Sequence, residues 1–118
     1  MHNFRQLLIW QKSMDLTDIV FLYCKDLPKE ERFNLADQMN RSSCSIPSNI
    51  AEGSGKRTSL QFKEYLSISL CSAYELETQL LISERRNYGK KDVLNQCLKL
   101  VKEVQKMIFT FREKVDTK

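Results

Sequence analysis

Hydrophobic residues recur every three or four positions through most of the chain, which is the spacing of an amphipathic α-helix. The clearest stripe lies near the C-terminus and comprises Leu94, Cys97, Val101, Val104, Ile108, Phe111 and Val115. A second stripe precedes it and comprises Phe62, Leu66, Ser69, Ala73, Leu76 and Leu80. Val93, Leu100 and Met107 widen the C-terminal stripe, so we expect this helix to contact more than one neighbour.

The N-terminal half contains two further helical patterns. The first runs from about residue 7 to 25 and carries Ile9, Leu16, Val20, Tyr23 and Leu27. The second runs from about residue 31 to 53, with Leu35, Met39, Ile46 and Ile50 on its buried side. Pro47 lacks an amide and crowds the carbonyl of Ser43, which costs about 3 kcal/mol in a helix. Because the apolar spacing continues in phase across Pro47, we expect one kinked helix rather than two separate helices.

Short breaks separate the four helical patterns. Leu27 precedes Pro28 and therefore avoids the α region, which ends the first helix. The run from Thr58 to Gln61 fits a capping box at the start of the third helix. Gly89 suits the left-handed position after its end. The chain is therefore predicted to be a single all-α domain over residues 1–118, an antiparallel up-down-up-down four-helix bundle with its second helix kinked at Pro47.

Composition supports this fold class and bears on the compartment. The 118 residues are 42% hydrophobic and 29% charged, which is ordinary for one globular domain. Three glycines and two prolines are too few for an all-β fold. No apolar run reaches the roughly 18 residues of a membrane span, and the first residues do not resemble a signal peptide. We therefore expect a cytoplasmic protein.

The sequence offers little catalytic chemistry. Cys24, Cys44, Cys71 and Cys97 form no C-x-x-C pair, so we expect buried thiols and no metal or other cofactor. The single histidine is His2, and no Glu-x-x-His motif is present for a di-iron site. The glycine-rich run 53–58 lacks the first glycine and the Ser/Thr of a phosphate loop. The protein is predicted not to be an enzyme.

A polar stripe on the second helix is the most unusual feature of the pattern. It comprises Asn34, Gln38, Arg41, Ser45, Asn49 and Glu52. Arg41 and Glu52 are three turns apart and cannot pair with each other. We expect each to have a partner on another helix or another subunit, with Glu75 and Glu77 as candidates for Arg41. A solvated stripe and a buried network that fixes register or a subunit contact both remain open.

Basic residues concentrate toward the C-terminus. Residues 85–118 carry ten basic and four acidic side chains, whereas residues 1–84 carry nine basic and eleven acidic ones. Candidate phosphate contacts are Lys56, Arg57, Arg85, Arg86, Lys90, Lys91, Lys99, Lys102 and Lys106. Tyr88 is the candidate for base stacking beside them. A lysine-rich helix that is simply solvated explains the same pattern.

The most specific motif is Ser45-Ile46-Pro47-Ser48-Asn49-Ile50-Ala51-Glu52-Gly53. It resembles the Ser-Ile-Pro-x-Asn-Ile-Ala-Glu-Gly hallmark of the four-helix-bundle proteins encoded in intervening sequences of bacterial 23S ribosomal RNA genes. The N-terminal residues Phe4, Leu7, Trp10 and Gln11 and the run Glu75-Leu76-Glu77-Thr78 are similar to two further family motifs. The chain departs from the family at Asn40, where an arginine is usual, at Ser42-Ser43, which replace Ala-Ala, and at Cys71-Ser72, which replace Gly-Ser.

The resemblance implies a homopentameric ring of bundles without an established enzymatic activity. It also implies kinship with the accessory protein of diversity-generating retroelements, a basic pentamer that binds nucleic acid and a reverse transcriptase. We therefore expect a self-associating bundle that binds RNA or DNA in a salt-sensitive manner. The alternative is a protein-interaction scaffold for a polymerase or ribosomal partner, with no direct role in nucleic-acid binding.

Overall fold

The structure, a computed structural model, describes residues 3–117 and consists of helices joined by short connections. The long helices are α1 (Leu8–Cys24), α2 (Leu35–Ser54), α3 (Ser59–Arg85) and α4 (Lys91–Glu113). Two single-turn 3₁₀ helices, η1 (Phe4–Gln6) and η2 (Lys29–Glu31), precede α1 and α2. Residues 3–117 contain no β-strand. The predicted all-α four-helix bundle is confirmed.

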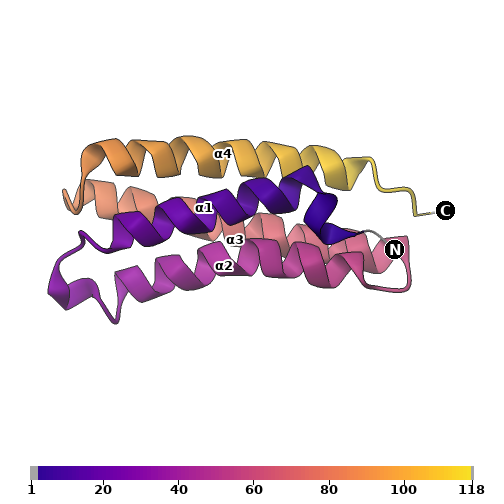
Figure 1. The fold of residues 1–118 in the computed structure, drawn as a ribbon, viewed down its shortest axis with the longest axis horizontal. Helices are drawn as coiled ribbons and strands as arrows, with labels where there is room; N and C mark the ends of the chain where they lie inside the picture. The colour runs from indigo at the N-terminus through magenta and orange to yellow at the C-terminus, as the bar shows by residue number, and fades with distance from the viewer. Residues whose placement is uncertain (1–2, 118) are drawn as a thin grey trace.

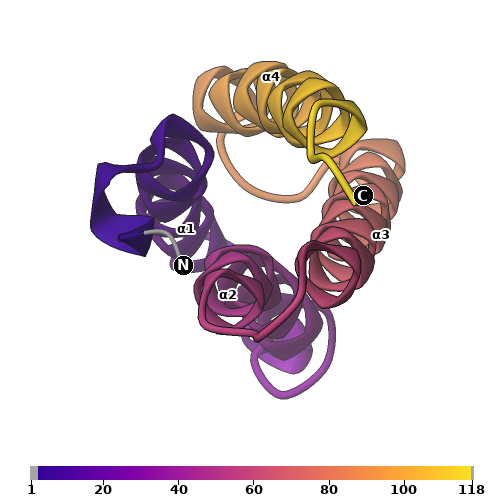
Figure 2. The ribbon, with the colours of Figure 1, turned by 90° about the vertical axis from the view of Figure 1, so that its right-hand side faces the viewer.

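The helices lie side by side and enclose one core. The chain changes direction at each of the three connections between the long helices (Figure 1). Seen from one end, α1, α2, α3 and α4 follow one another around the core, so each contacts the helix before it and the helix after it (Figure 2). The bundle is elongated, measuring 48 × 23 × 20 Å. Its two ends are therefore far apart, which separates any sites placed on opposite turns.

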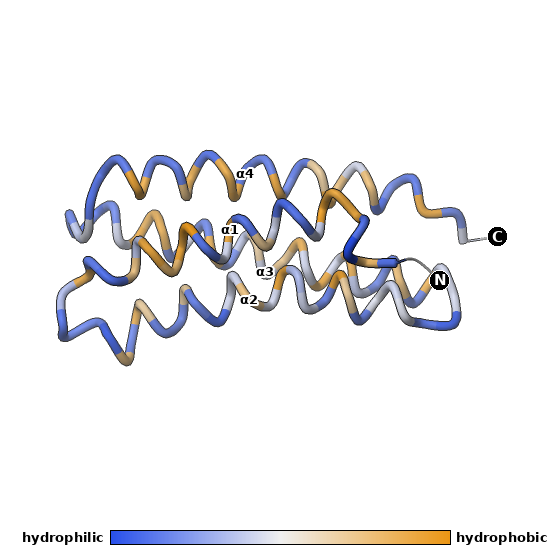
Figure 3. Tube along the Cα trace, viewed as in Figure 1, coloured by the Kyte–Doolittle hydropathy of each residue, from blue (hydrophilic) through white to orange (hydrophobic). Residues whose placement is uncertain are grey.

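The core consists of the residues that the helical spacing selects. Leu16 and Val20 of α1, Met39, Ile46 and Ile50 of α2, and Leu66, Leu76 and Leu80 of α3 are fully buried. Of the predicted C-terminal stripe, the first five residues are buried in α4, Phe111 is half-buried near the end of this helix, and Val115, beyond that end, is also half-buried. Figure 3 shows the consequence for α4: its inner edge is hydrophobic and its outer edge is hydrophilic.

α2 continues through Pro47 without interruption, so one helix rather than two is confirmed. Pro47 is itself buried. The kink expected there stays a prediction.

The ends of α3 follow known capping chemistry. The Thr58 hydroxyl accepts a hydrogen bond from the Gln61 amide at 3.1 Å, and the Gln61 side chain accepts one from the Thr58 amide at 3.3 Å. The predicted capping box is thus confirmed. At the other end, the left-handed residue next to the helix is Asn87 (φ +57°), not Gly89 as expected. The helix ends at Arg85, so Asn87 occupies the position that closes a Schellman motif, and Gly89 (φ +69°) shapes the turn beyond it.

Tyr23 ties α1 to the connection between α3 and α4. Its ring is fully buried, and its hydroxyl donates a hydrogen bond to the Tyr88 carbonyl at 2.8 Å. The same hydroxyl lies 2.6 Å from the Ser83 hydroxyl. The Tyr88 hydroxyl in turn donates to the Glu31 carboxylate at 3.0 Å. These bonds join three segments of the chain at one end of the bundle.

Candidate nucleic-acid interface

The predicted phosphate-binding residues are exposed but do not form a single patch. Lys56 and Arg57 lie in the α2–α3 connection, whereas the group Arg85, Arg86, Lys90 and Lys91 lies at the α3–α4 connection. These two connections stand at opposite ends of the bundle (Figure 1). Lys90 also forms an ion pair with Asp26 at 3.7 Å. No compact ligand can therefore contact both groups on one chain.

The lysines of α4 form the most continuous row of positive charge. Lys99, Lys102 and Lys106 are exposed and occupy the outer side of this helix. Among residues 3–117, none of the three forms an ion pair. The acidic residue between them, Glu103, pairs instead with Lys12 of α1 at 3.6 Å. The row therefore presents positive charge that the described part of the chain does not compensate.

Tyr88 has little ring surface left for stacking. Its ring packs against the hydrophobic core, and its hydroxyl is bonded to Glu31. The hydrogen bond to the Glu31 carboxylate raises the pKa of the Tyr88 hydroxyl, because the carboxylate needs the proton of that bond. Tyr88 thus acts in the structure as a link between the α3–α4 connection and η2.

Two other aromatic residues, which the sequence reasoning missed, are much more accessible. Tyr74 of α3 and Phe109 of α4 are each 48% exposed. They line an open cavity of about 210 Å³ between the two helices, together with Gln105, Lys106 and Thr110. Each follows a fully buried residue, Ala73 or Ile108, and so falls outside the apolar stripe of its helix. A large aromatic residue on the polar side of an amphipathic pattern is the signal that the sequence offers.

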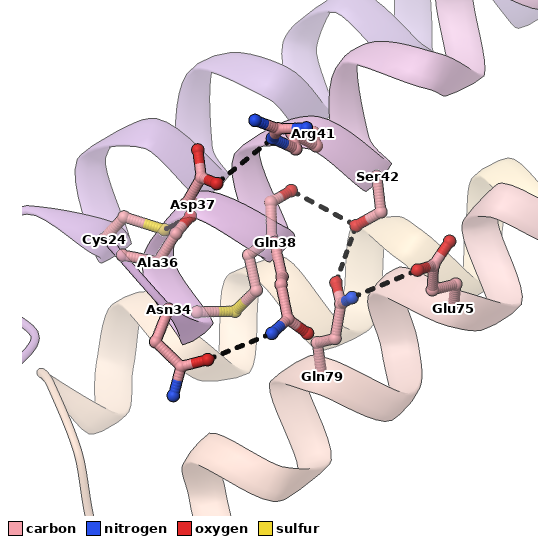
Figure 4. Close-up of polar contacts among 10 residues, drawn as sticks. Cys24, Asn34, Ala36, Asp37, Gln38, Arg41, Ser42, Glu75 and Gln79 are labelled. Carbon is pink, nitrogen blue, oxygen red and sulfur yellow. Dashed lines mark hydrogen bonds and ion pairs between the residues drawn. The ribbon is translucent and has the colours of Figure 1, made fainter. Parts of the chain in front are cut away.

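In the polar stripe of α2, Arg41 has a different partner from the one that we expected. Arg41 pairs with Asp37, one turn earlier on the same helix, at 3.1 Å (Figure 4). The expected pairing of Arg41 with Glu75 or Glu77 is therefore wrong. Its side chain is largely exposed, and a partner four residues away on the same helix is reached without crossing to α3.

The two glutamates of α3 have neutral partners. Glu75 accepts a hydrogen bond from Gln79 at 3.4 Å, and Glu77 accepts one from Gln105 of α4 at 2.9 Å. Glu52 is exposed and forms no ion pair within residues 3–117. A subunit contact made by Arg41 or Glu52 stays a prediction.

A network of small polar side chains joins α2 to α3 instead. The Ser42 hydroxyl donates to the Gln79 side-chain oxygen at 2.7 Å (Figure 4). One turn further along α2, the Ser45 and Ser72 hydroxyls are 2.8 Å apart. Asn49 donates to Ser45 at 2.9 Å. These bonds fix how the two helices are aligned, and they include Ser45 and Asn49 of the predicted network.

The comparison with known proteins agrees with this architecture. A family model described as "23S rRNA-intervening sequence protein" matches residues 5–110. The chain belongs to this family. A crystal structure of a protein of unknown function from the S23 ribosomal protein family of Bacteroides thetaiotaomicron has the same fold, with a TM-score of 0.82 and 24% identity over 91% of this chain and 96% of that chain. None of the curated proteins matches the sequence.

In this intervening-sequence protein, the signature Ser45–Gly53 has a packing role. Ile46 and Ile50 are fully buried, and Ser45, which Asn49 holds in place, bonds to α3. Gly53 lies where a β-carbon would come within 2.6 Å of the Tyr65 Cβ. The motif therefore allows α2 and α3 to approach closely, and Glu52 is its only charged member.

The N-terminal family motif holds η1 against α1. The Phe4 and Trp10 rings meet edge to face with centroids 5.2 Å apart. Gln11 donates a side-chain hydrogen bond to the Arg5 carbonyl at 2.9 Å. These contacts fix the turn that leads into the bundle.

The cysteines of the intervening-sequence protein fall into two groups. Burial raises the pKa of the Cys97 thiol, which is fully buried, and of the half-buried Cys24 thiol, each to about 12. Both therefore stay protonated at neutral pH. The expectation of burial is wrong for Cys44 and Cys71, which are exposed because both lie on the sides of α2 and α3 away from the core.

Between residues 3 and 117, no group of three or more His, Cys, Asp or Glu side chains could hold a metal ion. His2 lies outside the described residues. None of the helices in that range combines the length and apolar character that crossing a membrane requires.

Proposed function

We propose that this intervening-sequence protein is a non-enzymatic cytoplasmic bundle that self-associates, as a pentamer, and binds RNA or DNA through phosphate contacts. The row Lys99, Lys102 and Lys106 on α4 supports nucleic-acid binding most directly. It spans about 10 Å along the helix axis, and its charges have no acidic partner within residues 3–117. Cations presented in this way bind phosphates with little dependence on sequence and release counterions on binding.

Self-association is supported by apolar side chains that α1 leaves in contact with solvent. Leu8, Met14, Phe21 and Leu22 are exposed on this helix. Phe21 and Leu22 also line an open cavity of about 630 Å³ between α1 and α2. Exposed apolar surface of this kind is typical of protein–protein contacts. Five copies with a net charge of +4 each carry +20, which strengthens attraction for a polyanion.

Reversing the α4 charges is expected to abolish most of the binding. The variant Lys99→Glu, Lys102→Glu, Lys106→Glu should bind a structured 23S ribosomal RNA fragment at least about 100-fold more weakly than the parent protein at low salt. Each of the three lysines is expected to neutralise one phosphate, so the slope of log affinity against log salt should fall by about 3 per chain. Fluorescence anisotropy over a salt series measures both quantities.

The matched control reverses three exposed cations elsewhere: Arg5→Glu, Lys29→Glu and Arg32→Glu. It changes the net charge by the same amount and should retain most of the affinity and the slope. Equal losses in the two triple variants would show that only net charge matters. Unchanged binding by the α4 variant would exclude the α4 row as the interface.

The assembly can be tested with a single charged residue in the α1 surface. Phe21→Glu should reduce the mass measured by light scattering from about five chains to a smaller species, because a carboxylate cannot be buried unpaired in an apolar contact. Leu60→Glu is the control, since Leu60 and Phe21 are each 56% exposed. A monomeric parent protein, or equal masses for the two variants, would contradict the proposal.

A protein scaffold is the second candidate function. Phe33 in the α1–α2 connection is 83% exposed and carries the Arg32 guanidinium 5.1 Å from its ring centroid. An aromatic and arginine pair of this kind is typical of protein-binding hot spots. Retention of a protein partner after nuclease treatment, with loss of that partner in Phe33→Ala, would favour this function.

A further inference from the structure

The cavity between α3 and α4 combines the two features that single-stranded nucleic acid requires. Tyr74 and Phe109 expose about half of their surface beside it, and Lys106 lies on its rim. Proteins that bind unpaired strands place aromatic rings for the bases beside cations for the backbone. A nucleic-acid duplex cannot use such rings, because its bases are already stacked and paired.

Acidic groups near the cavity are engaged by other side chains. Glu77 accepts a hydrogen bond from Gln105, which also donates to the Ala73 carbonyl at 3.3 Å. Glu113 forms an ion pair with Arg112 at 3.3 Å. Lys102 and Lys106, by contrast, form no ion pair with any residue from 3 to 117. Lys106 therefore places a positive charge without an acidic partner on the rim of the cavity, and Lys102 adds a second one turn away on the same helix, which suits a phosphodiester.

Phe109 is also held in a way that suits stacking, and Tyr74 offers a free polar group. Arg112 lies 5.1 Å from the Phe109 ring centroid and donates to the Ser67 hydroxyl on α3 at 3.3 Å. This cation–π contact restricts the ring while leaving 48% of the residue exposed. The Tyr74 hydroxyl has no hydrogen-bond partner among the described residues and is free to bond to a base or a sugar.

We infer that the Tyr74–Phe109 cavity binds an unpaired base, while Lys102 and Lys106 contact the phosphates on either side of it. The inference rests on the proposed function and narrows it, because it makes single-stranded segments, rather than duplexes, the preferred ligand. The α4 row supplies the sequence-independent attraction, and the two rings supply the discrimination between unpaired and paired strands.

The test compares the parent protein with Tyr74→Leu, Phe109→Leu and the double variant. Leucine keeps an apolar side chain but removes the aromatic face. The ligands are a labelled RNA of about 20 nucleotides, the DNA strand of the same sequence, and the corresponding duplexes. We expect the double variant to bind both single strands at least about tenfold more weakly, and the duplexes within about twofold of the parent protein.

The salt dependence separates stacking from charge. The double leucine variant should keep the parent slope of log affinity against log salt, whereas Lys102→Glu with Lys106→Glu should lower that slope for both kinds of strand. Phe33→Leu is the matched control, because it removes a more exposed aromatic ring in the α1–α2 connection. It should leave the affinities for single strands and for duplexes unchanged.

Different failures point to different conclusions. Equal losses for single strands and duplexes in the double leucine variant, or no loss, would overturn the base-binding cavity while leaving the α4 charge row intact. Tighter binding of the duplexes than of the single strands by the parent protein would also overturn the base-binding cavity and leave the α4 charge row intact. A change in the mass of the assembly in that variant would assign the rings to a subunit contact instead. Absence of binding by the parent protein to any of the strands would refute the proposed function and this inference together.

Discussion

Replacing Gly89 with alanine is expected to lower the free energy of unfolding by about 3–4 kcal/mol. At φ +69° an L-residue costs roughly 1–2 kcal/mol relative to glycine. The added β-carbon would also lie 2.5 Å from Cε1 and 2.9 Å from Cζ of Tyr23, whose ring is fully buried. Moving that ring breaks the hydroxyl contacts with Ser83 and Tyr88, each worth about 1 kcal/mol. Urea denaturation measures the total.

Gly55→Ala is the appropriate control for this substitution. Gly55 has φ −91°, and the nearest atom to an added β-carbon is the Glu52 carbonyl oxygen at 3.6 Å, an ordinary contact. Its effect should stay within about 0.5 kcal/mol. If Gly89→Ala and Gly55→Ala unfold at the same urea concentration, the Tyr23 contact does not constrain the α3–α4 connection.

The helices and their buried sides can be predicted because one physical regularity determines both. A residue on a helix returns to the same side every three or four positions, so alternating apolar positions define the core side without knowledge of the neighbours. Leu66, Ala73, Leu76 and Leu80 illustrate this: the spacing predicts that all four are buried, and all four are. The capping box at Thr58 is equally local and is predictable for the same reason.

Residue type is a weaker guide to burial than position on the helix. Cysteine is usually buried, yet Cys44 and Cys71 are exposed, because both lie outside the apolar stripes of their helices. Tyr74 and Phe109 are exposed for the same reason, although aromatic side chains are usually assigned to the core. A helical stripe therefore indicates not only which residues form the core, but also which apolar residues are left exposed for other uses.

Contacts between helices depend on alignment, which periodicity does not specify. Charge alone makes the glutamates of α3 plausible partners for Arg41, whereas Asp37 lies one turn away on the same helix. The bonds from Ser42 to Gln79 and from Ser45 to Ser72 cannot be paired from the sequence, because it does not specify the axial offset of α2 against α3. That offset depends on the close approach at Gly53, which is a three-dimensional property.

Stability is expected to fall steeply as the pH rises from about 9 to about 11. Burial raises the pKa of the Cys97 thiol from 9.0 to about 12. Across that interval the unfolded chain releases the thiol proton while the folded chain keeps it, so the unfolded state binds fewer protons. The free energy of unfolding then decreases by up to ~1.4 kcal/mol per pH unit, or about 2 kcal/mol over the interval for Cys97.

Two other groups act in the same direction. Cys24 has a raised pKa for the same reason, and it contributes less because its side chain is partly exposed. Burial also raises the pKa of Tyr23, which adds to the loss of stability once the pH exceeds about 10. Tyr23 should therefore still lower the stability above about pH 10 when both thiols are removed.

Removing the buried thiols tests the cause directly. The variant Cys24→Ala, Cys97→Ala should start from a lower stability near neutral pH, because Cys97 fills part of the core, but its stability should fall less with pH. The control Cys44→Ala, Cys71→Ala keeps both buried thiols and should retain the parent slope. Urea denaturation at several pH values in the presence of a reducing phosphine gives each slope without interference from disulfides. Parallel slopes for the two double variants would show that ionisation of the Cys24 and Cys97 thiols does not control alkaline unfolding.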